Sequence, residues 1–266
     1  MRILVTNDDG IFAEGILHLA QAAGRFGDVL VVAPDREQSA TSHSLTLHRP
    51  LRMRKETLQL ERPPVGDLVA YAVDGTPTDC VNLAVQGFLK NDGLPDLVLS
   101  GINYGPNMGD DVTYSGTVSA TFEASLHGLP GIAFSQFLDG DYSFAEAEDM
   151  VVRFLEQLFA EGETLPKDLL LNVNLPVGHC RGVRMTRLGK RFYEQTVTEK
   201  KDPKGRSYFW IGGTPVWEAD EGTDHHAVEA GYISVTPLHL DLTDYQGLEH
   251  YAPLGQRLDA GMQPQD

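Results

Sequence analysis

Two adjacent carboxylates, Asp8 and Asp9, follow a short apolar run at residues 3–5 and precede Gly10. At a separation of about 4 Å and an effective dielectric constant of about 20, two such charges repel each other by roughly 4 kcal/mol. The pair is stable if both acids face water, if one acid holds a proton, or if a cation bridges them. A solvated turn is one interpretation, because Asn-Asp-Asp-Gly suits a turn. A place after the first strand of a parallel sheet favours the other interpretation, a metal site.

Neutral oxygen donors occur in two further polar segments of the chain. Ser39 and Ser42 lie in one segment, and Asn103 and Asn107 lie in the other. Taken singly, each is more simply explained as a loop residue that bonds its own backbone. Together with the carboxylates they form an all-oxygen set, which favours Mg²⁺, Mn²⁺ or Ca²⁺ over zinc. We therefore expect one divalent cation per subunit, with magnesium or manganese preferred.

The segment from Ser100 to Ala120 is a long loop, rich in glycine and asparagine, that runs into Ser115-Gly116-Thr117 at the start of an expected helix. A helix N-terminus offers free N–H groups and partial positive charge, and a glycine lets the backbone approach an anion closely. A hydroxyl that only caps the helix is compatible with this role. Long ordered loops in compact domains are usually functional, so this segment predicts a phosphate-binding site.

These parts combine into one reaction, the hydrolysis of a phosphate ester. A cation on Asp8 and Asp9 would polarise a phosphoryl oxygen and activate water. The loop donors and the helix terminus would hold the other phosphate oxygens while charge develops. One of the two acids could orient or deprotonate the water. The residues alone therefore predict a metal-dependent phosphomonoesterase.

Short apolar strands alternate with helices through the first half of the chain. The expected strands are residues 3–5, 29–33, 69–73, 97–99 and 132–134, and the expected helices are residues 14–25 and 118–126, with a further helix starting at Thr76. Continuous apolar strands separated by helices indicate an α/β fold whose mostly parallel sheet is covered on both faces. Ligands of such sheets bind at the carboxyl ends of the strands, where the polar segments fall.

The second half of the chain is richer in strands. An amphipathic helix is expected at residues 144–159. Strands are expected at residues 169–173, 183–188, 192–198, 208–211 and 232–235. We expect residues 45–57 to form a hairpin arm and residues 200–206 a charged turn. Residues 1–140 are thus assigned to the catalytic core, and residues 141–266 to the remaining core helix and strands with a C-terminal oligomerisation arm, within one domain.

Net charge and composition limit the classes of molecule that the protein is expected to bind. The 266 residues carry a formal net charge of −17, which disfavours long nucleic acids because their affinity rests on cationic side chains. Cys80 and Cys180 are too far apart and too few for a disulfide framework or a thiolate metal site. No leader pattern and no apolar run of about 18 residues is visible, so we expect a cytoplasmic protein without membrane contact.

Other protein classes also place acids or glycines after a first strand. A response-regulator receiver needs an acid after the strand at residues 97–99, where this chain has Ser100. A haloacid-dehalogenase-like phosphatase uses Asp-x-Asp-Gly-Thr, whereas here the acids are adjacent and Ile11 replaces the threonine. Gly10 and Gly15 do not fit the dinucleotide-binding pattern. An aspartyl-phosphate mechanism and a metal-dependent nucleotide-binding regulatory protein without turnover stay open as alternatives.

Several long motifs closely resemble those of the survival protein SurE family, in the same order. They are Asn7-Asp8-Asp9-Gly10, Ala33-Pro34-Asp35-Arg36-Glu37-Gln38-Ser39, Asp74-Gly75-Thr76-Pro77, Ser100-Gly101-Ile102-Asn103-Tyr104-Gly105 and Tyr114-Ser115-Gly116-Thr117-Val118-Ser119-Ala120. The similarity continues weakly through residues 232–238 and so spans nearly the whole chain.

The resemblance implies a 5'/3'-nucleotidase that hydrolyses nucleoside monophosphates, with short polyphosphate as a further substrate of some members. It implies a Rossmann-like three-layer core with a swapped C-terminal arm that builds homodimers, often homotetramers. Metal coordination is implied for Asp8, Asp9, Ser39 and Asn103, and phosphate contacts are implied for Asn107, Ser115, Gly116 and Thr117. In one departure, Ala40-Thr41-Ser42 follows Ser39 where the family often has a glycine.

Some polar residues are expected to have no direct role in the chemistry. His43 is expected to pack or bond within its own loop, although proton donation is a second possibility for it. Asp110 and Asp111 are expected to be solvated loop acids. His225 and His226 are expected to lie in an exposed loop.

Overall fold

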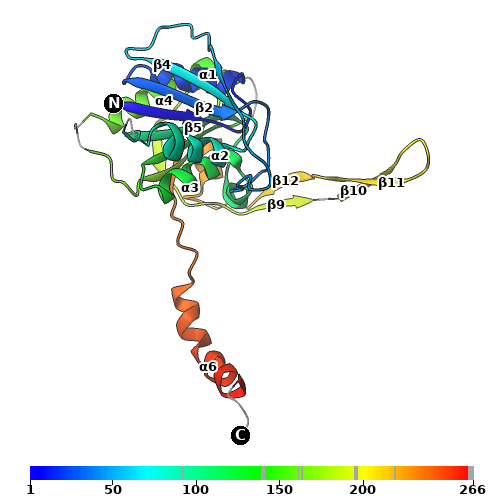
Figure 1. Ribbon diagram of the computed structural model, residues 1–266. Coiled ribbons are helices and arrows are strands. Elements are labelled where there is room, and N and C mark those ends of the chain that lie inside the picture. The colour runs from blue at the N-terminus through cyan, green and yellow to red at the C-terminus, as the bar shows by residue number, and fades with distance from the viewer. Residues whose placement is uncertain are drawn as a thin grey trace.

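The computed structural model describes residues 1–90, 93–138, 142–160, 162, 164–194, 197–218 and 220–262. Most of the chain forms a body built on one sheet, from which a long β-hairpin and a C-terminal helix project in different directions (Figure 1). Within the described residues, no helix is both long and apolar enough to cross a membrane.

The central sheet has nine strands and draws on both halves of the chain. In spatial order they are β3 (Met53–Glu56), β4 (Leu68–Val73), β2 (Asp28–Pro34), β1 (Arg2–Thr6), β5 (Leu97–Tyr104), β6 (Gly131–Gln136), β7 (Leu170–Leu175), β13 (Ile233–Pro237) and β8 (Val183–Met185). The six strands from β4 to β7 are parallel, while β3 and β13 pair antiparallel with β4 and β7. The expected mostly parallel sheet is therefore confirmed, and all six parallel strands end at one edge.

Helices cover both faces of the sheet. On one face lie α1 (Glu14–Ala23) and α4 (Phe144–Leu158), and on the other lie α2 (Pro77–Asn82), its π-helical continuation η1 (Leu83–Phe88) and α3 (Gly116–Leu126). Within β1, Ile3 and Val5 pack in the first layer, whereas Leu4 packs in the second. Each such fully buried side chain stabilises the fold by about 1.5–3 kcal/mol. The result is the α/β, Rossmann-like, three-layer core that the sequence predicts.

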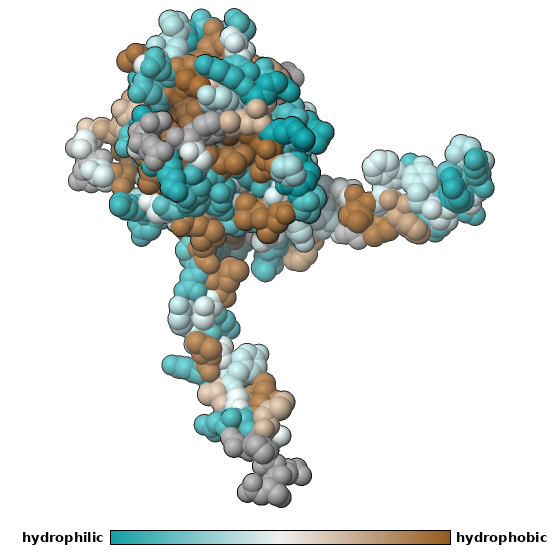
Figure 2. Space-filling model, viewed as in Figure 1, coloured by the Kyte–Doolittle hydropathy of each residue, from teal (hydrophilic) through white to brown (hydrophobic). Residues whose placement is uncertain are grey.

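Two segments of the C-terminal half leave this core. The hairpin begins with β9 (Arg191–Glu194) against β12 (Thr214–Trp217) and continues as β10 (Val197–Lys201) against β11 (Ser207–Ile211). The second segment is α6 (Tyr245–Met262). Exposed apolar side chains lie along both segments, including Ile211 on the hairpin and Leu248 on α6. Figure 2 shows hydrophobic patches on both projections. The expected β-rich C-terminal extension is thus present.

The expectation of a hairpin arm at residues 45–57 is wrong. Residues 53–56 form β3, an edge strand that pairs with β4 from Met53 opposite Val73 to Glu56 opposite Ala70. The carboxylate of Asp74 accepts the backbone N–H of Arg52 at 2.7 Å, which holds the chain at the start of the strand. The pairing satisfies backbone groups of β4 that would otherwise form the sheet edge. The charged residues at 54–56 resemble a solvated arm in sequence, because their pairing with β4 depends on a register that the sequence does not show.

Candidate metal and phosphate site

The turn after β1 presents both carboxylates at the edge where the parallel strands end. The Asn7 amide Nδ2 donates to the carbonyl of Gly10 at 2.9 Å, which closes the turn. Gly10 has φ +100°, and a Cβ there would lie 3.1 Å from the backbone of Arg36. Glycine is therefore needed for the loop after β2 to pass directly beside this turn.

Asp8 is held from behind by the start of α3. Its side chain is buried, and both the hydroxyl and the backbone N–H of Thr117 donate to it. Gly116 makes this approach possible, because a Cβ there would lie 2.9 Å from Cβ and 3.0 Å from Oδ2 of Asp8. Burial raises the pKa of Asp8 to about 6, the Thr117 hydrogen bond opposes the rise, and the charge of Asp9 adds to it. Asp8 is thus held in one position, and hydrogen bonds from Thr117 stabilise its charged form against the effect of burial.

Asp9 is less buried and faces the next loop. Its Oδ2 accepts the backbone N–H of Tyr104 at 3.0 Å. Burial raises the pKa of Asp9, the Tyr104 bond opposes this rise, and the charge of Glu37 contributes to it. Glu37 in turn accepts a hydrogen bond from the Ser39 hydroxyl at 2.6 Å. A third carboxylate therefore borders the pair and adds to its need for positive charge.

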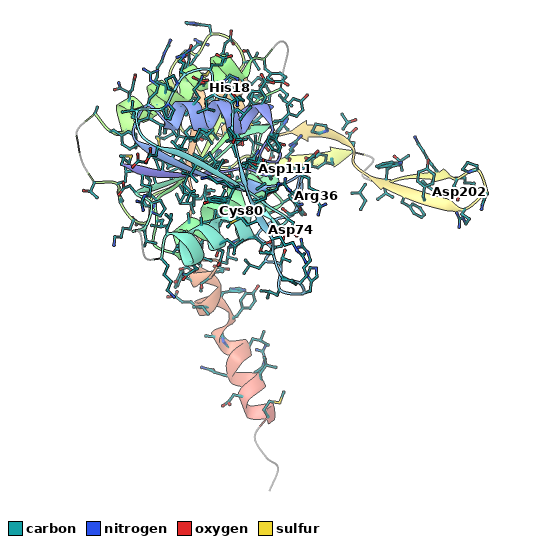
Figure 3. The ribbon with its side chains drawn as sticks, turned by 45° about the horizontal axis from the view of Figure 1, so that its top comes forward. His18, Arg36, Asp74, Cys80, Asp111 and Asp202 are labelled. Carbon is teal, nitrogen blue, oxygen red and sulfur yellow. The ribbon has the colours of Figure 1, made fainter. Side chains whose placement is uncertain are left out.

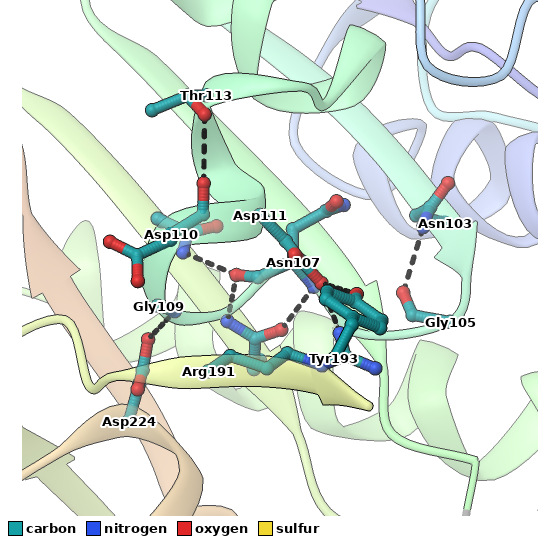
Figure 4. Close-up of polar contacts among 12 residues, drawn as sticks. Asn103, Gly105, Asn107, Gly109, Asp110, Asp111, Thr113, Arg191, Tyr193 and Asp224 are labelled. Atoms are coloured by element: carbon teal, nitrogen blue, oxygen red, sulfur yellow. Dashed lines mark hydrogen bonds and ion pairs between the residues drawn. The ribbon is translucent and has the colours of Figure 1, made fainter. Parts of the chain in front are cut away.

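Asn103 reaches the same place from an irregularity in β5. Ser100 pairs with Ala133 of β6 but Asn103 pairs with Ser135, so β5 carries one additional residue at this point. Such a bulge changes the direction in which the following side chains point. Asn103 Nδ2 donates to the carbonyl of Gly105 at 2.7 Å (Figure 4), and its Oδ1 accepts from the Thr117 hydroxyl at 3.2 Å. The amide oxygen is thereby directed toward Asp8.

These donors share one cavity and fit a hard divalent cation. Asp8, Asp9, Ser39 and Asn103 all line a cavity of about 600 Å³. Two neighbouring carboxylates whose pKa values are raised by burial would release protons in favour of a cation. In the described parts of the chain, no three His, Cys, Asp or Glu side chains form a metal-binding group, so neutral oxygens must complete the coordination. An oxygen-only donor set of this kind suits Mg²⁺ or Mn²⁺.

The residues expected to contact phosphate divide into two groups. Asn107 and Ser115 line the cavity, whereas Gly116 and Thr117 lie behind Asp8. The Ser115 hydroxyl also caps α3 by accepting the N–H of Val118 at 3.0 Å. The structure thus brings all eight expected site residues to one end of the sheet, and their individual roles stay predictions.

Asn107 is fixed by a network of buried amides. Its Nδ2 donates to Ser135 at 2.8 Å, and its backbone N–H donates to Asn174 Oδ1 at 2.9 Å. Its carbonyl accepts from the side-chain amides of Asn172 and Asn174. The ends of β6 and β7 therefore set the position of this loop at the cavity.

The expectation that Asp111 is a solvated acid is wrong. Its Oδ2 accepts from Arg191 Nη1 and, at 2.6 Å, from the hydroxyl of Tyr193, both on β9 (Figure 4). Asp111 and Tyr193 also line the cavity, as do Tyr104 and Tyr114. The sequence does not predict the contact between Asp111 and Arg191, because it depends on how the base of the hairpin packs against the loop that carries Asp111. Asp110, in contrast, is exposed as expected.

The histidines differ from expectation in one case. His225 and His226 lie in α5 (Asp224–Glu229), not in a loop, because Thr223 caps that helix by accepting the N–H of His226. His43 behaves as expected of a bonded residue, although its partner is outside its loop: Nε2 lies 2.9 Å from Oε2 of buried Glu123 on α3. Neither His225 nor His43 lines the cavity with Asp8.

Fold and site together define an α/β protein with a Rossmann-like core and an acidic cavity at the carboxyl edge of its sheet. The family model described as survival protein SurE matches residues 3–195. The 5'-nucleotidase SurE of Syntrophotalea carbinolica is 52% identical over 254 residues, which cover 94% of this chain and 95% of that protein. The 5'-nucleotidase SurE of Deinococcus radiodurans is 48% identical over 246 residues, covering 91% and 88%.

A solved structure supports the same relationship. The crystal structure of the SurE protein from Aquifex aeolicus aligns with a TM-score of 0.80 and 44% sequence identity, covering 96% of this chain and 100% of that one. The chain belongs to the SurE family.

Proposed function

We propose that this protein is a metal-dependent 5'-nucleotidase that hydrolyses nucleoside monophosphates to nucleoside and phosphate. The observation that carries the proposal is the adjacent carboxylates of buried Asp8 and half-buried Asp9, which share one cavity with Asn103 and with the N-cap of α3. Relatives about 50% identical over nearly their full length are named 5'-nucleotidase, which supports the substrate class. The 3'-nucleotidase activity and polyphosphate hydrolysis belong to the same proposal as secondary activities.

One Mg²⁺ or Mn²⁺ would be held by Asp8, Asp9, Ser39 and Asn103. When bound, it supplies Lewis-acid polarisation of a phosphoryl oxygen and lowers the pKa of water. The need for it follows from the cavity lining, which includes the acids Asp8, Asp9, Glu37 and Asp111 but no lysine or arginine among the described residues. A dianionic phosphate ester cannot enter such a site at low energetic cost unless positive charge is added.

The chain's own groups bind and orient the phosphate. The start of α3 offers partial positive charge at Ser115 and Gly116, and the loop at Asn107 is held rigidly beside it. Thr117 fixes Asp8 from behind through its hydroxyl and its N–H. Rigid donors that face the developing charge need no reorganisation during the reaction.

Asp9 is the acid that we propose orients the attacking water and accepts its proton. It is less buried than Asp8, and one of its oxygens is anchored by the N–H of Tyr104. A carboxylate anchored in this way can orient a water molecule and accept its proton.

We further propose that the hairpin and α6 mediate assembly into homodimers or homotetramers, by exchange of the C-terminal arm. The exposed apolar side chains on both segments support this proposal, since isolated projections of this kind are costly in water. We also propose a cytoplasmic location, in keeping with the free cysteines Cys80 and Cys180. Long nucleic acids and membranes are not among the proposed partners.

Phosphate release tests the proposed activity. The purified protein is incubated with each common nucleoside 5'- and 3'-monophosphate and with short polyphosphate, in Mg²⁺, Mn²⁺ or chelator. We expect release from the 5'-monophosphates with either metal and none with chelator. Asp9→Asn should lower the rate at least a hundredfold with the fold intact by circular dichroism. Binding of nucleotide without release would instead identify a regulatory binding protein, and a trapped aspartyl-phosphate would identify the haloacid-dehalogenase-like mechanism.

A further inference from the structure

One wall of the cavity is aromatic and apolar. Away from the carboxylates, the lining includes Tyr104, Tyr114, Tyr193, Pro106 and Ile211. A cavity of about 600 Å³ is large enough for a whole nucleotide, not only for its phosphate. Of these side chains, Tyr193 and Ile211 come from the hairpin, so the hairpin contributes to the cavity of its own chain.

Tyr193 in this wall is held by two partners. Its hydroxyl donates to Oδ2 of Asp111 at 2.6 Å, and the Arg191 guanidinium lies 4.8 Å from its ring centroid. Burial, reinforced by the bond to Asp111, raises the pKa of Tyr193 to about 12, so its hydroxyl remains a proton donor at neutral pH. The side chain is nevertheless 39% exposed, and that surface is available to a ligand in the cavity.

Arg191 connects this ring to the base of the hairpin. Nη1 of Arg191 donates to Asp111, and the same guanidinium lies 4.7 Å from the ring centroid of Trp217 on β12. Trp217 stacks on His225 of α5, with ring centroids 4.2 Å apart and an interplanar angle of 14°. Figure 3 shows Asp111 at the root of the hairpin and Asp202 at its distant tip. Both strands at the base of the hairpin therefore contact the body, β9 through Arg191 and β12 through Trp217.

Buried Asp224 fixes the loop and the strand that face each other here. Its two carboxylate oxygens accept the N–H groups of Gly109 at 2.8 Å and Gly189 at 2.9 Å. Gly109 begins η2 (Gly109–Thr113), which carries Asp111, and Gly189 precedes β9, which carries Tyr193. The distance between Asp111 and Tyr193 is thus set by one buried acid.

We propose that Tyr193 is a substrate-binding residue that stacks on the nucleobase, with Asp111 and Arg191 as the residues that position its ring. This inference rests on the proposed nucleotidase function and adds a base subsite to it. Stacking does not require one particular base, because every base has a π-face, and it contributes about 1–3 kcal/mol per base. The site therefore accepts all common bases and binds purines more tightly than pyrimidines, since purines cover more of the ring.

Kinetics with and without a base provide the test. KM and kcat are measured for AMP, GMP, CMP, UMP and ribose 5-phosphate with wild type, Tyr193→Ala and Tyr193→Phe. For Tyr193→Ala we expect KM to rise about tenfold for the nucleotides, the equivalent of ~1.4 kcal/mol, and more for purines. KM for ribose 5-phosphate should change less than twofold. Tyr193→Phe keeps the ring, so its KM values should stay within about threefold of wild type.

A variant of Asp111 tests whether this residue positions the ring of Tyr193. Asp111→Asn should raise KM for nucleotides severalfold with kcat preserved, and should again spare ribose 5-phosphate. Leu126→Ala is the control, because it removes an exposed apolar side chain outside the cavity lining and outside the hairpin and α6. It should leave every kinetic constant unchanged.

The results distinguish a failure of the nucleotidase function from a failure of the base subsite. If wild type releases no phosphate from any nucleoside monophosphate, the proposed function fails before any variant is made. If wild type is active and Tyr193→Ala raises KM equally for AMP and ribose 5-phosphate, Tyr193 is structural and the base subsite is refuted. Unchanged KM for AMP in Tyr193→Ala would refute it as well.

Discussion

The hydroxyl of Thr117 donates a hydrogen bond to Oδ1 of Asp8, and this contact joins the first turn of α3 to the end of β1. The two residues are 109 positions apart in the chain. Gly116 allows the contact, since a larger residue would meet Asp8 itself. The helix that offers partial positive charge to an anion thus also stabilises the charge of the carboxylate beside it.

Thr117→Val removes the hydroxyl and keeps the shape of the side chain. Because Thr117 lowers the pKa of Asp8, its loss should raise that pKa further and weaken cation binding about tenfold. Stability should fall by about 1–3 kcal/mol, the cost of a buried acceptor without its donor. Calorimetric titration with Mn²⁺ and chemical denaturation measure the two effects. Thr117→Ser retains the hydroxyl and should resemble wild type; an unchanged affinity in Thr117→Val would contradict the assigned role.

The pKa of Asp8 predicts how the metal-free protein responds to pH. Its folded pKa is about 6, above the usual value for an unfolded aspartate, so the folded state binds more protons between about pH 4 and pH 6. The stabilisation is complete below pH 4 and is lost as pH rises through 6, by about 3 kcal/mol. Denaturation in chelator, compared with Asp8→Asn, isolates this contribution. The difference between the two proteins should decrease with rising pH over this window, and a flat difference would show that Asp8 titrates normally.

Gly116→Ala tests the close approach of α3 to the carboxylate. The added Cβ would lie 2.9 Å from Cβ of Asp8 and 3.1 Å from Oγ1 of Thr41, so the helix start must shift. We expect phosphate release to drop at least tenfold and stability to fall by about 1–3 kcal/mol. Gly87→Ala is the matched control, because Gly87 is exposed and a Cβ there meets nothing within 4 Å. If Gly116→Ala is as active as Gly87→Ala, the helix start does not need its present position.

Asp224→Ala tests the buried acid that joins the site loop to the hairpin. Its loss leaves the N–H groups of Gly109, Gly189 and His225 without their acceptor. We expect the free energy of unfolding to drop by about 2–4 kcal/mol. Asp224→Asn keeps one acceptor oxygen and should lose about half as much. Hydrogen exchange should show faster exchange at Gly109 and Gly189 in Asp224→Ala, and equal protection in both variants would exclude the bridging role.

The parts of the fold that depend on local pattern were predictable from the sequence. Apolar runs gave the inner strands, and the spacing of apolar residues gave α4. Because parallel strands end at one edge of the sheet, the proximity of Asp8, Asp9 and Asn103 could be predicted without any long-range contact. The cap of α5 is also a local feature, since Thr223 precedes Asp224-His225-His226, but no long helical pattern follows it to predict a helix.

What the sequence did not reveal depends on long-range register. Asp111 looked like any acid in a polar loop until β9 placed Arg191 and Tyr193 against it. The strand β3 looked like part of an arm, because nothing in residues 53–56 specifies pairing with β4. In both cases the deciding partner lies in another segment, and hydrophobic periodicity carries no information about which segments meet.

Calorimetric titration of the chelator-treated protein with Mn²⁺ shows whether Asp8 and Asp9 bind a divalent cation. We expect one ion per chain in the wild type and at least a hundredfold weaker binding in the double variant Asp8→Asn, Asp9→Asn. Asp110→Asn, which removes an exposed carboxylate outside the cavity lining, should bind like wild type. Wild-type affinity in the double variant would exclude these two carboxylates as the metal ligands.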